Sequence, residues 1–273
     1  MQSPHDDHRH KLETLYREVL GGGRLEQLGT VIAADYQPHL ARFRAEPVLR
    51  PGIDALTERL KYCGLLVHRV ARIVSDDDLA FVHVKYSGAA PVAGVDIFRF
   101  DDRGRICEHW NVRQPMPEGS SQGDDRIASL LTPDAPPAHH PRWLKQRVGR
   151  MLVELWSQGN PALVAEYYAP GYIQHNADMP GGFARIREIV ETDIVKYMAA
   201  TGGAFPVDVH AMAAEGDIVC VYLSIFMAGI NRHDGARSTN VDIFRVDRDG
   251  KMIEHWDVLE MDSEPVTNAR TLF

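Results

Sequence analysis

Residues 95–110 read VDIFRFDDRGRICEHW, and residues 241–256 read VDIFRVDRDGKMIEHW. Ten of the sixteen positions are identical without a gap, which is far above chance for a chain of ordinary composition. Weaker similarity continues upstream, where residues 36–39 (YQPH) align with residues 172–175 (YIQH). The chain therefore contains an internal duplication, and we expect one structural unit to occur twice.

Each copy begins with helical periodicity and continues with the two-residue alternation of strands. Helices are expected from about residue 12 to 20, over 25–34 and after 51–52 in the first copy, and over 143–155, over 161–168 and after 180–182 in the second. The predicted strands are residues 67–74, 79–86, 94–100 and 105–112, and then 207–213, 218–227, 240–246 and 251–259. Helices followed by a mostly antiparallel, curved sheet make each copy an α+β unit.

The segment between the copies has the composition of a linker. Residues 118–140 are rich in Gly, Ser, Asp and Pro, although Ile127–Leu131 is apolar enough to dock as a short turn. We therefore predict a first domain over residues 1–118, a linker over 119–140 and a second domain over 141–273.

Composition excludes several classes of protein. The 273 residues are 44% hydrophobic and carry a net charge of −8, which leaves no basic surface for a nucleic acid. The three scattered cysteines (Cys63, Cys107 and Cys220) form neither a disulfide framework nor a zinc cluster motif. The polar start of the sequence and the lack of a long apolar run favour a cytoplasmic protein without a membrane span.

The repeated run D-I-F-R-x-D-x-x-G-[RK]-[IM]-x-E-H-W-[DN]-V, with Tyr172-Ile173-Gln174-His175-Asn176 upstream, resembles the SnoaL-like polyketide cyclase branch of the nuclear transport factor 2 (NTF2)-like superfamily. The similarity covers both halves of the chain. It implies two tandem cone-shaped α+β barrels, in which helices cover a bent sheet around an apolar cavity. Such domains commonly pair through their sheets, so the resemblance implies either an intramolecular pseudo-dimer or a homo-oligomer.

The hairpin between the last two strands decides which side chains share a face. If Phe100 pairs with Arg105, Asp96 lies opposite His109, whereas a shorter, bulged loop places Asp96 opposite Trp110. The same alternatives hold for Asp242, opposite His255 or Trp256. We favour the first register, which places Asp242, His255 and Asp257 on one concave face, and we expect His175 beside them.

The resemblance implies that an aspartate on the last strand acts as the acid and base, and Asp257 holds that position. We expect His255 and His175 to orient or polarise the substrate, Asp242 to set the state of the imidazole, and Tyr172, Trp256 and Tyr222 to line the pocket. The corresponding pocket residues of the first copy are His39, His83, Asp96, His109, Trp110 and Asn111. Because Asn111 replaces the aspartate, we expect the second copy to be the active one.

Structural roles are open for the same residues. Asp96 and Asp242 can bond neighbouring backbone or arginine groups, the tryptophans can be core, and the histidines can be satisfied core groups. A metal site from His39, His83, Asp96 and His109 matches no compact ligand motif. No cofactor and no bound metal are predicted, since phosphate-binding, dinucleotide-binding and nucleophile-elbow motifs are missing from the sequence.

The leading functional hypothesis is a cofactor-independent enzyme that uses general acid/base chemistry on a hydrophobic, carbonyl-bearing small molecule. The reaction would be an aldol-type cyclisation, an isomerisation or a dehydration. The alternative is a non-catalytic module of the same fold that binds a small molecule or serves assembly.

Overall fold

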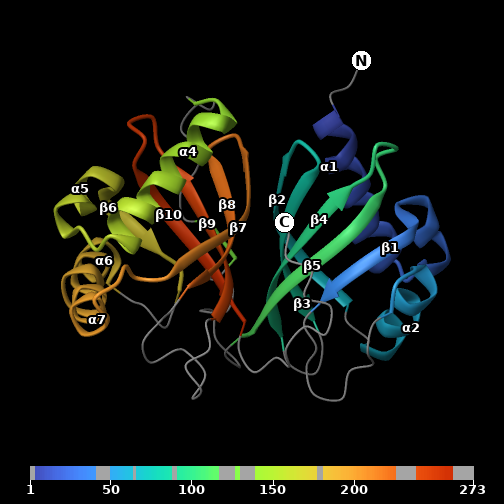
Figure 1. Ribbon diagram of the computed structural model, residues 1–273. Helices are drawn as coiled ribbons and strands as arrows, with labels where there is room; N and C mark the ends of the chain where they lie inside the picture. The colour runs from blue at the N-terminus through green and yellow to red at the C-terminus, as the bar shows by residue number, and fades with distance from the viewer. Residues whose placement is uncertain are drawn as a thin grey trace. The chain divides into compact units, whose positions relative to one another are not determined.

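The structure is a computed structural model that describes residues 4–40, 50–63, 66–87, 91–116, 127–129, 139–176, 181–225 and 238–260 (Figure 1). The chain divides into two compact units, residues 1–123 with 260–273, and residues 124–259. Most of the predicted linker lies outside the described residues, so the boundaries at residues 118 and 141 stay a prediction.

Helical segments come first in the first unit and are followed by most of its strands. The helical segments are α1 (Pro4–Thr14), its continuation as a π-helical turn (Leu15–Leu20), a 3-10 turn (Leu25–Thr30) and α2 (Ile53–Cys63). The strands are β1 (Ile32–Leu40), β2 (Leu66–Asp76), β3 (Leu79–Ser87), β4 (Val92–Phe100) and β5 (Ile106–Pro115).

The second unit repeats this order. Its helices are α4 (Pro141–Met151) with a π-helical turn (Leu152–Ser157), a 3-10 turn (Pro161–Leu163), α5 (Val164–Tyr167), α6 (Gly182–Ile189) with a π-helical turn (Val190–Ile194), and α7 (Val195–Thr201). Its strands are β6 (Tyr168–Gln174), β7 (Val207–Glu215), β8 (Ile218–Ile225), β9 (Ser238–Val246) and β10 (Met252–Leu259).

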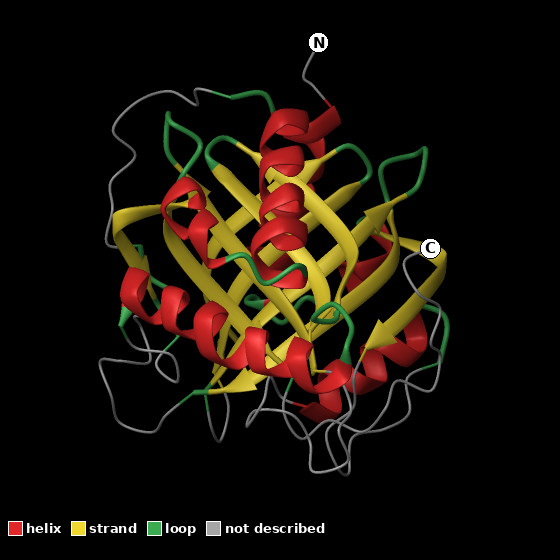
Figure 2. Ribbon diagram, turned by 60° about the vertical axis from the view of Figure 1, so that its left-hand side comes forward, coloured by secondary structure: helices red, strands yellow, loops and turns green. Residues whose placement is uncertain are grey.

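The two sheets have the same topology. Their strand orders are β1-β5-β4-β3-β2 and β6-β10-β9-β8-β7. The edge strands β1 and β6 run parallel to β5 and β10, and the other neighbours are antiparallel. Figure 2 shows long, bent strands with helices lying across them. The expectation of two tandem α+β units, each with helices on a mostly antiparallel sheet, is confirmed.

The sequence missed one strand in each sheet. β1 and β6 overlap the ends of the helices expected over residues 25–34 and 161–168. Pro38 lies in β1, and Pro170 and Gly171 lie in β6, so neither strand shows the alternation of a strand interior. Both are edge strands, where a proline that cannot donate a ladder hydrogen bond is tolerated.

The hairpin loops of both units use the same turn chemistry. Asp101 Oδ1 accepts hydrogen bonds from the backbone N–H groups of Arg103 and Arg105. Asp247 Oδ1 does the same for residues 249 and 251. Gly104 and Gly250 then adopt positive φ angles of 66° and 78°, where a side chain is strained.

The register of the hairpin differs from both alternatives of the sequence analysis. Asp96 pairs with Asn111 and Asp242 pairs with Asp257, rather than with His109 or Trp110 and with His255 or Trp256. The loop is one residue longer than in the favoured register. A bulge, at Cys107 in the first unit and at Ile253 in the second, shifts the pairing by one further residue. A shift of two residues keeps each side chain on its face, so the predicted sharing of a face holds although the predicted pairing was wrong.

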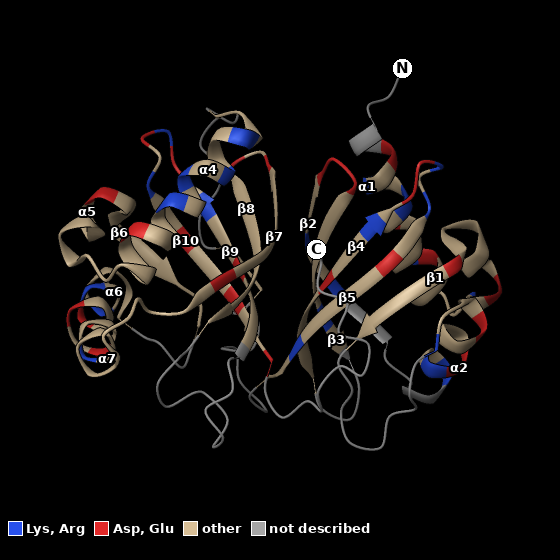
Figure 3. Cartoon of the chain, viewed as in Figure 1, with Lys and Arg blue, Asp and Glu red and all other residues tan. Residues whose placement is uncertain are grey.

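Each unit encloses its own apolar core between helices and sheet. Leu12, Leu15 and Phe98 belong to the first core, and Leu155, Val221 and Phe244 belong to the second. Acidic and basic residues are interspersed over the helices and hairpin loops of both units (Figure 3). Among the described residues, no helix is long and apolar enough to cross a membrane.

Candidate active site

Strand alternation gives each sheet a face that packs under the helices, here called the inner face, and an outer face. On β4 and β5 the inner face carries Asp96, Phe98, His109 and Asn111. The inner face of the second unit carries Asp242, His255 and Asp257 at the corresponding strand positions. Asp242, His255 and Asp257 therefore share one face of the second sheet, and Asp96 and His109 share the corresponding face of the first.

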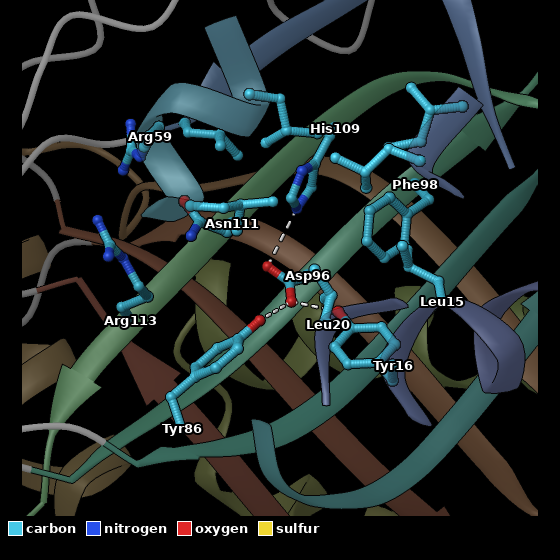
Figure 4. Close-up of a pocket in the computed structure, with 15 residues that line it drawn as sticks. Leu15, Tyr16, Leu20, Arg59, Tyr86, Asp96, Phe98, His109, Asn111 and Arg113 are labelled. Carbon is cyan, nitrogen blue, oxygen red and sulfur yellow. Dashed lines mark hydrogen bonds and ion pairs between the residues drawn. The ribbon is translucent and has the colours of Figure 1, made fainter. Parts of the chain in front are cut away.

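The first unit holds a cavity of about 80 Å³ on this face (Figure 4). Most of its wall is apolar, formed by Leu15, Leu20, Leu28, Ile32, Leu40, Leu56, Leu60 and Phe98. The polar residues that line it are Tyr16, Arg59, Tyr86, Asp96, His109, Asn111 and Arg113. A mostly apolar cavity with a few convergent polar groups is the usual form of a small-molecule site.

Asp96 is the centre of the polar groups. Its Oδ2 atom accepts hydrogen bonds from the hydroxyls of Tyr16 and Tyr86, and its Oδ1 atom lies 3.0 Å from His109 Nε2. The other ring nitrogen of His109, Nδ1, lies 2.9 Å from the hydroxyl of Tyr36. Figure 4 shows Tyr16, Tyr86 and His109 converging on Asp96 from different elements.

The environment keeps Asp96 ionised and the tyrosines neutral. Burial by itself would raise the pKa of Asp96, but the hydrogen bond and charge of His109, with the hydrogen bonds of Tyr16 and Tyr86, lower it below its ordinary value. Burial first, and then the charge of Asp96, raise the pKa of Tyr16, Tyr36 and Tyr86.

One end of the cavity is cationic. Arg59 and Arg113 are buried, each with 5% of its surface exposed, and both line the cavity beside Asn111. Figure 4 shows these three side chains on the side of the cavity away from Leu15 and Phe98. The Oδ1 atom of Asn111 is buried and has no hydrogen-bond partner among the described residues.

In the second unit three ligand-type groups gather on the inner face. One atom each of Asp242, His255 and Asp257 lies within 4.8 Å of the other two. His255 Nε2 is 3.7 Å from Asp242 Oδ1, which is longer than a hydrogen bond. Amides hold all three: Asn240 donates to Asp242 at 2.8 Å, Asn176 donates to Asp257 at 2.8 Å, and Gln174 Oε1 lies 3.0 Å from His255 Nδ1.

Tyr172 lies near these groups. It is 5% exposed, and its ring centroid lies 6.4 Å from that of His255. Burial first, and then the charges of neighbouring groups that include Asp257 and Asp242, raise the pKa of Tyr172. Its hydroxyl has no hydrogen-bond partner among the described residues, whereas Tyr36 at the corresponding position of the first unit contacts His109.

His175 does not join Asp242, His255 and Asp257, which corrects the sequence prediction. Its Nε2 atom lies 2.9 Å from Glu254 Oε1, and its ring stacks on Trp256 at 5.0 Å. Glu254 and Trp256 flank His255 in β10, so their side chains point to the outer face. Trp256 donates a hydrogen bond of 2.7 Å from Nε1 to the carbonyl of Ala128. Trp256 therefore packs on the outer face of the sheet and does not line a pocket on the inner face.

The first unit repeats this arrangement on its outer face. His39 Nε2 lies 3.3 Å from Glu108 Oε1, and its ring stacks on Trp110 at 4.6 Å. His83 pairs with Val95 across the sheet and Tyr222 pairs with Val241, whereas Asp96 and Asp242 pair with Val82 and Val221. His39, His83, Trp110 and Tyr222 therefore lie on the face away from Asp96 and Asp242, and the metal set considered for the first copy is not assembled.

Sequence reasoning missed the groups that come from distant elements. Tyr16, Tyr86, Arg59 and Arg113 reach the cavity of the first unit from a helical turn, from β3, from α2 and from the end of β5. Tyr16 occupies an apolar position of an amphipathic helix, which gives no sign of a role. The one signal in the sequence is that the two copies carry different residues at these positions, such as Tyr16 in the first and Leu152 in the second.

The family model of the SnoaL-like domain matches this chain twice, over residues 12–109 and 148–255. The chain therefore belongs to the SnoaL-like family and contains two copies of its domain. No curated protein matches the chain significantly.

Solved structures match single copies of the domain. TsrD from Streptomyces laurentii is 19% identical, the match covers 44% of this chain and 91% of TsrD, and the TM-score is 0.35. A loop truncation variant of IdmH is 23% identical, with 39% and 92% covered and a TM-score of 0.34. SalBIII, an epoxide hydrolase/cyclase-like enzyme in pyran ring formation in polyether salinomycin, is 19% identical, with 44% and 92% covered and a TM-score of 0.35.

Proposed function

We propose that the first copy is an acid/base enzyme for a small, largely apolar molecule that bears a carbonyl group. The observation that carries this proposal is the position of Asp96 in an apolar cavity, where its carboxylate accepts hydrogen bonds from Tyr16, Tyr86 and His109. A carboxylate beside neutral hydroxyl donors supplies both a base for a carbon acid and donors for the oxygen that becomes negative.

Substrate binding would change the basicity of Asp96. A carbonyl oxygen that enters the cavity takes the hydroxyl donors of Tyr16 and Tyr86, and Asp96 then loses two of the hydrogen bonds that lower its pKa. The α-C–H bond breaks, its proton goes to Asp96, and the electron pair moves to the oxygen of the resulting enolate. The two tyrosine hydroxyls stabilise this oxygen.

The fate of the enolate defines the reaction. Return of the proton from Asp96 to another carbon is an isomerisation, and attack of the enolate carbon on a second carbonyl is an aldol cyclisation. Departure of a β-hydroxyl group is a dehydration, in which Asp96 returns the abstracted proton to the departing oxygen and water leaves.

The test measures how fast the α-protons of small apolar ketones exchange for deuterium. The exchange is monitored by NMR in D₂O. We expect the full chain to catalyse exchange, and Asp96→Asn to reduce the rate by roughly 10²–10⁴-fold. Asp102→Asn, in the exposed part of the hairpin loop, is the matched control and should exchange at the wild-type rate. An unchanged rate in Asp96→Asn would contradict the proposal.

The same assay separates the remaining hypotheses. The prediction that Asp257 is the acid and base requires the rate to fall in Asp257→Asn and to persist in Asp96→Asn. A non-catalytic module would bind ketones or phenols, observed as shifts of the ligand resonances, and would exchange no proton in any variant.

A further inference from the structure

The inner faces of the two copies carry opposite electrostatic character. In the first, Arg59 and Arg113 line the cavity, and Asp96 has two tyrosine donors. In the second, the corresponding residues are apolar. Ile189 and Leu259 take the positions of Arg59 and Arg113, and Leu152 and Ile225 take those of the tyrosines Tyr16 and Tyr86. The strand register fixes two of these correspondences, because Arg113 pairs with Gly94 as Leu259 pairs with Asn240, and Tyr86 pairs with Val92 as Ile225 pairs with Ser238.

The second copy also gains an acid. Asp257 stands where the first copy has Asn111, so two carboxylates and an imidazole share the inner face. Two carboxylates that are buried or nearly so, this close together, are unfavourable unless a positive charge or a proton offsets them. Relative to the first copy, the region that gains the acid lacks two arginines and two tyrosine hydroxyls.

The spacing of the three groups suits a bound ion. His255 Nε2 and Asp242 Oδ1 are 3.7 Å apart, against 3.0 Å for the direct hydrogen bond between His109 and Asp96. Two ligand atoms at about 2.1 Å from one ion, separated by this distance, subtend an angle of roughly 120° at the ion. One ligand atom from each of the three groups lies within 4.8 Å of the other two, so side-chain shifts of a few tenths of an ångström bring all three to about 2.1 Å from one ion.

The tautomer of His255 is set for metal binding. Gln174 Oε1 accepts the backbone N–H of Asn176 at 3.1 Å, which fixes the orientation of the Gln174 amide. His255 Nδ1, 3.0 Å from the same oxygen, must therefore be the N–H donor. In a neutral imidazole this leaves the lone pair on Nε2, the atom that faces Asp242.

A second layer of amides holds the ligands, and only in this copy. Gln174, Asn176 and Asn240 each contact one of the three groups. The first copy has Pro38, Leu40 and Gly94 at these positions, none of which has a polar side chain. Outer hydrogen bonds that orient each ligand are a regular property of metal sites.

Tyr172 is an independent sign of a missing partner. Its hydroxyl is buried beside these groups without a hydrogen bond among the described residues. A buried hydroxyl of this kind is unfavourable unless a hydrogen-bond partner lies in front of it. A metal ion, or a water molecule bound to one, would supply that partner.

We propose that the second copy binds one divalent metal ion of the Mn²⁺ or Zn²⁺ class through Asp242, His255 and Asp257. Imidazole with carboxylate oxygens suits these ions better than Mg²⁺ or Ca²⁺, which prefer oxygen ligands alone. The site is separate from the acid/base site proposed for the first copy, and the two proposals stand or fall independently.

The experiment uses the full chain after removal of metals with a chelator. Equilibrium dialysis against Mn²⁺ and, separately, Zn²⁺ should give one tightly bound ion per chain, and bound Mn²⁺ should lose the EPR signal of the hydrated ion. Asp257→Asn and His255→Gln should weaken binding more than 100-fold, and Asn176→Ala by about 10–100-fold. Asp257→Asn is expected to stay folded, because Asn111 occupies the corresponding position of the first copy.

Two controls separate this site from others. The double change His139→Gln and His140→Gln removes an adjacent pair of histidines and should keep the bound ion. His109→Gln, in the first copy, should also keep it while it impairs proton exchange. Failure to bind Mn²⁺ or Zn²⁺, or equal binding by wild type, Asp257→Asn and His255→Gln, would overturn the proposal.

Discussion

Asp96 and Asp242 occupy corresponding positions and are held by different neighbours. Asp96 receives two tyrosine hydroxyls and an imidazole, whereas Asp242 receives an amide from Asn240 and lies 3.7 Å from His255. The repeated motif identified both aspartates as candidate site residues in the sequence. The partners of Asp96 include Tyr16, which lies 80 residues away, and a pattern of local spacing carries no information about it.

The lowered pKa of Asp96 predicts how stability depends on pH. Its pKa is lower in the folded than in the unfolded protein, so its contribution to the free energy of unfolding is complete above the unfolded value near 3.9 and is lost as the pH falls through the folded value. We expect Asp96→Asn to lower the free energy of unfolding at pH 7 by about 1–3 kcal/mol.

Urea unfolding followed by tryptophan fluorescence measures this effect. The difference between wild type and Asp96→Asn should be constant from pH 7 to about pH 5 and should shrink below about pH 4. Asp102→Asn serves as the control for a change of surface charge. A difference that stays constant down to pH 3 would contradict the assignment of hydrogen bonds to the ionised carboxylate.

At the scale of elements, the hairpin shows why the sequence predicted the face correctly and the pairing wrongly. The loop and the bulge at Cys107 or Ile253 each shift the register by one residue. Either shift alone would move His109 or His255 to the outer face, and together they cancel. A bulge depends on packing around the strand and has no marker in the residues of this motif, so only the structure reveals it.

The same hairpins depend on their glycines. Gly104 and Gly250 have positive φ angles, and a Cβ atom there would lie 2.6 Å from Lys11 Nζ or from the ring of Trp143. We expect Gly104→Ala and Gly250→Ala each to lower the free energy of unfolding by about 1–2 kcal/mol. Thermal unfolding checks this, with Asp102→Ala as the control in the same loop, and equal melting of all three variants would count against the strained turn.

At the scale of the whole molecule, the duplication gives two separate cores. Leu12 is fully buried in the first and Leu155 in the second. Removing a large buried side chain destabilises a core by roughly 2–5 kcal/mol. We expect Leu12→Ala to lower the melting temperature of one calorimetric transition and Leu155→Ala to lower that of the other.

The double variant tests whether the cores are independent. Its two shifts should equal those of the single variants, because distant sites with no shared partner add. A single transition that both substitutions lower equally would show instead that the two units unfold together. The periodicity and the repeat predicted both units from the sequence, since helices followed by strands occur twice in the same order. The repeat also revealed Asn111 in place of Asp257, but it could not show which distant residues complete each inner face.

The presence of both domains in one polypeptide has a consequence for how their sites vary. In an assembly of identical chains, every substitution appears in all subunits, so no subunit can hold Asn where another holds Asp. Here positions 111 and 257 are encoded separately, and each inner face accepts changes that leave the other intact. The covalent link also fixes one copy of each kind of site per molecule, a ratio that does not depend on the concentration of the protein.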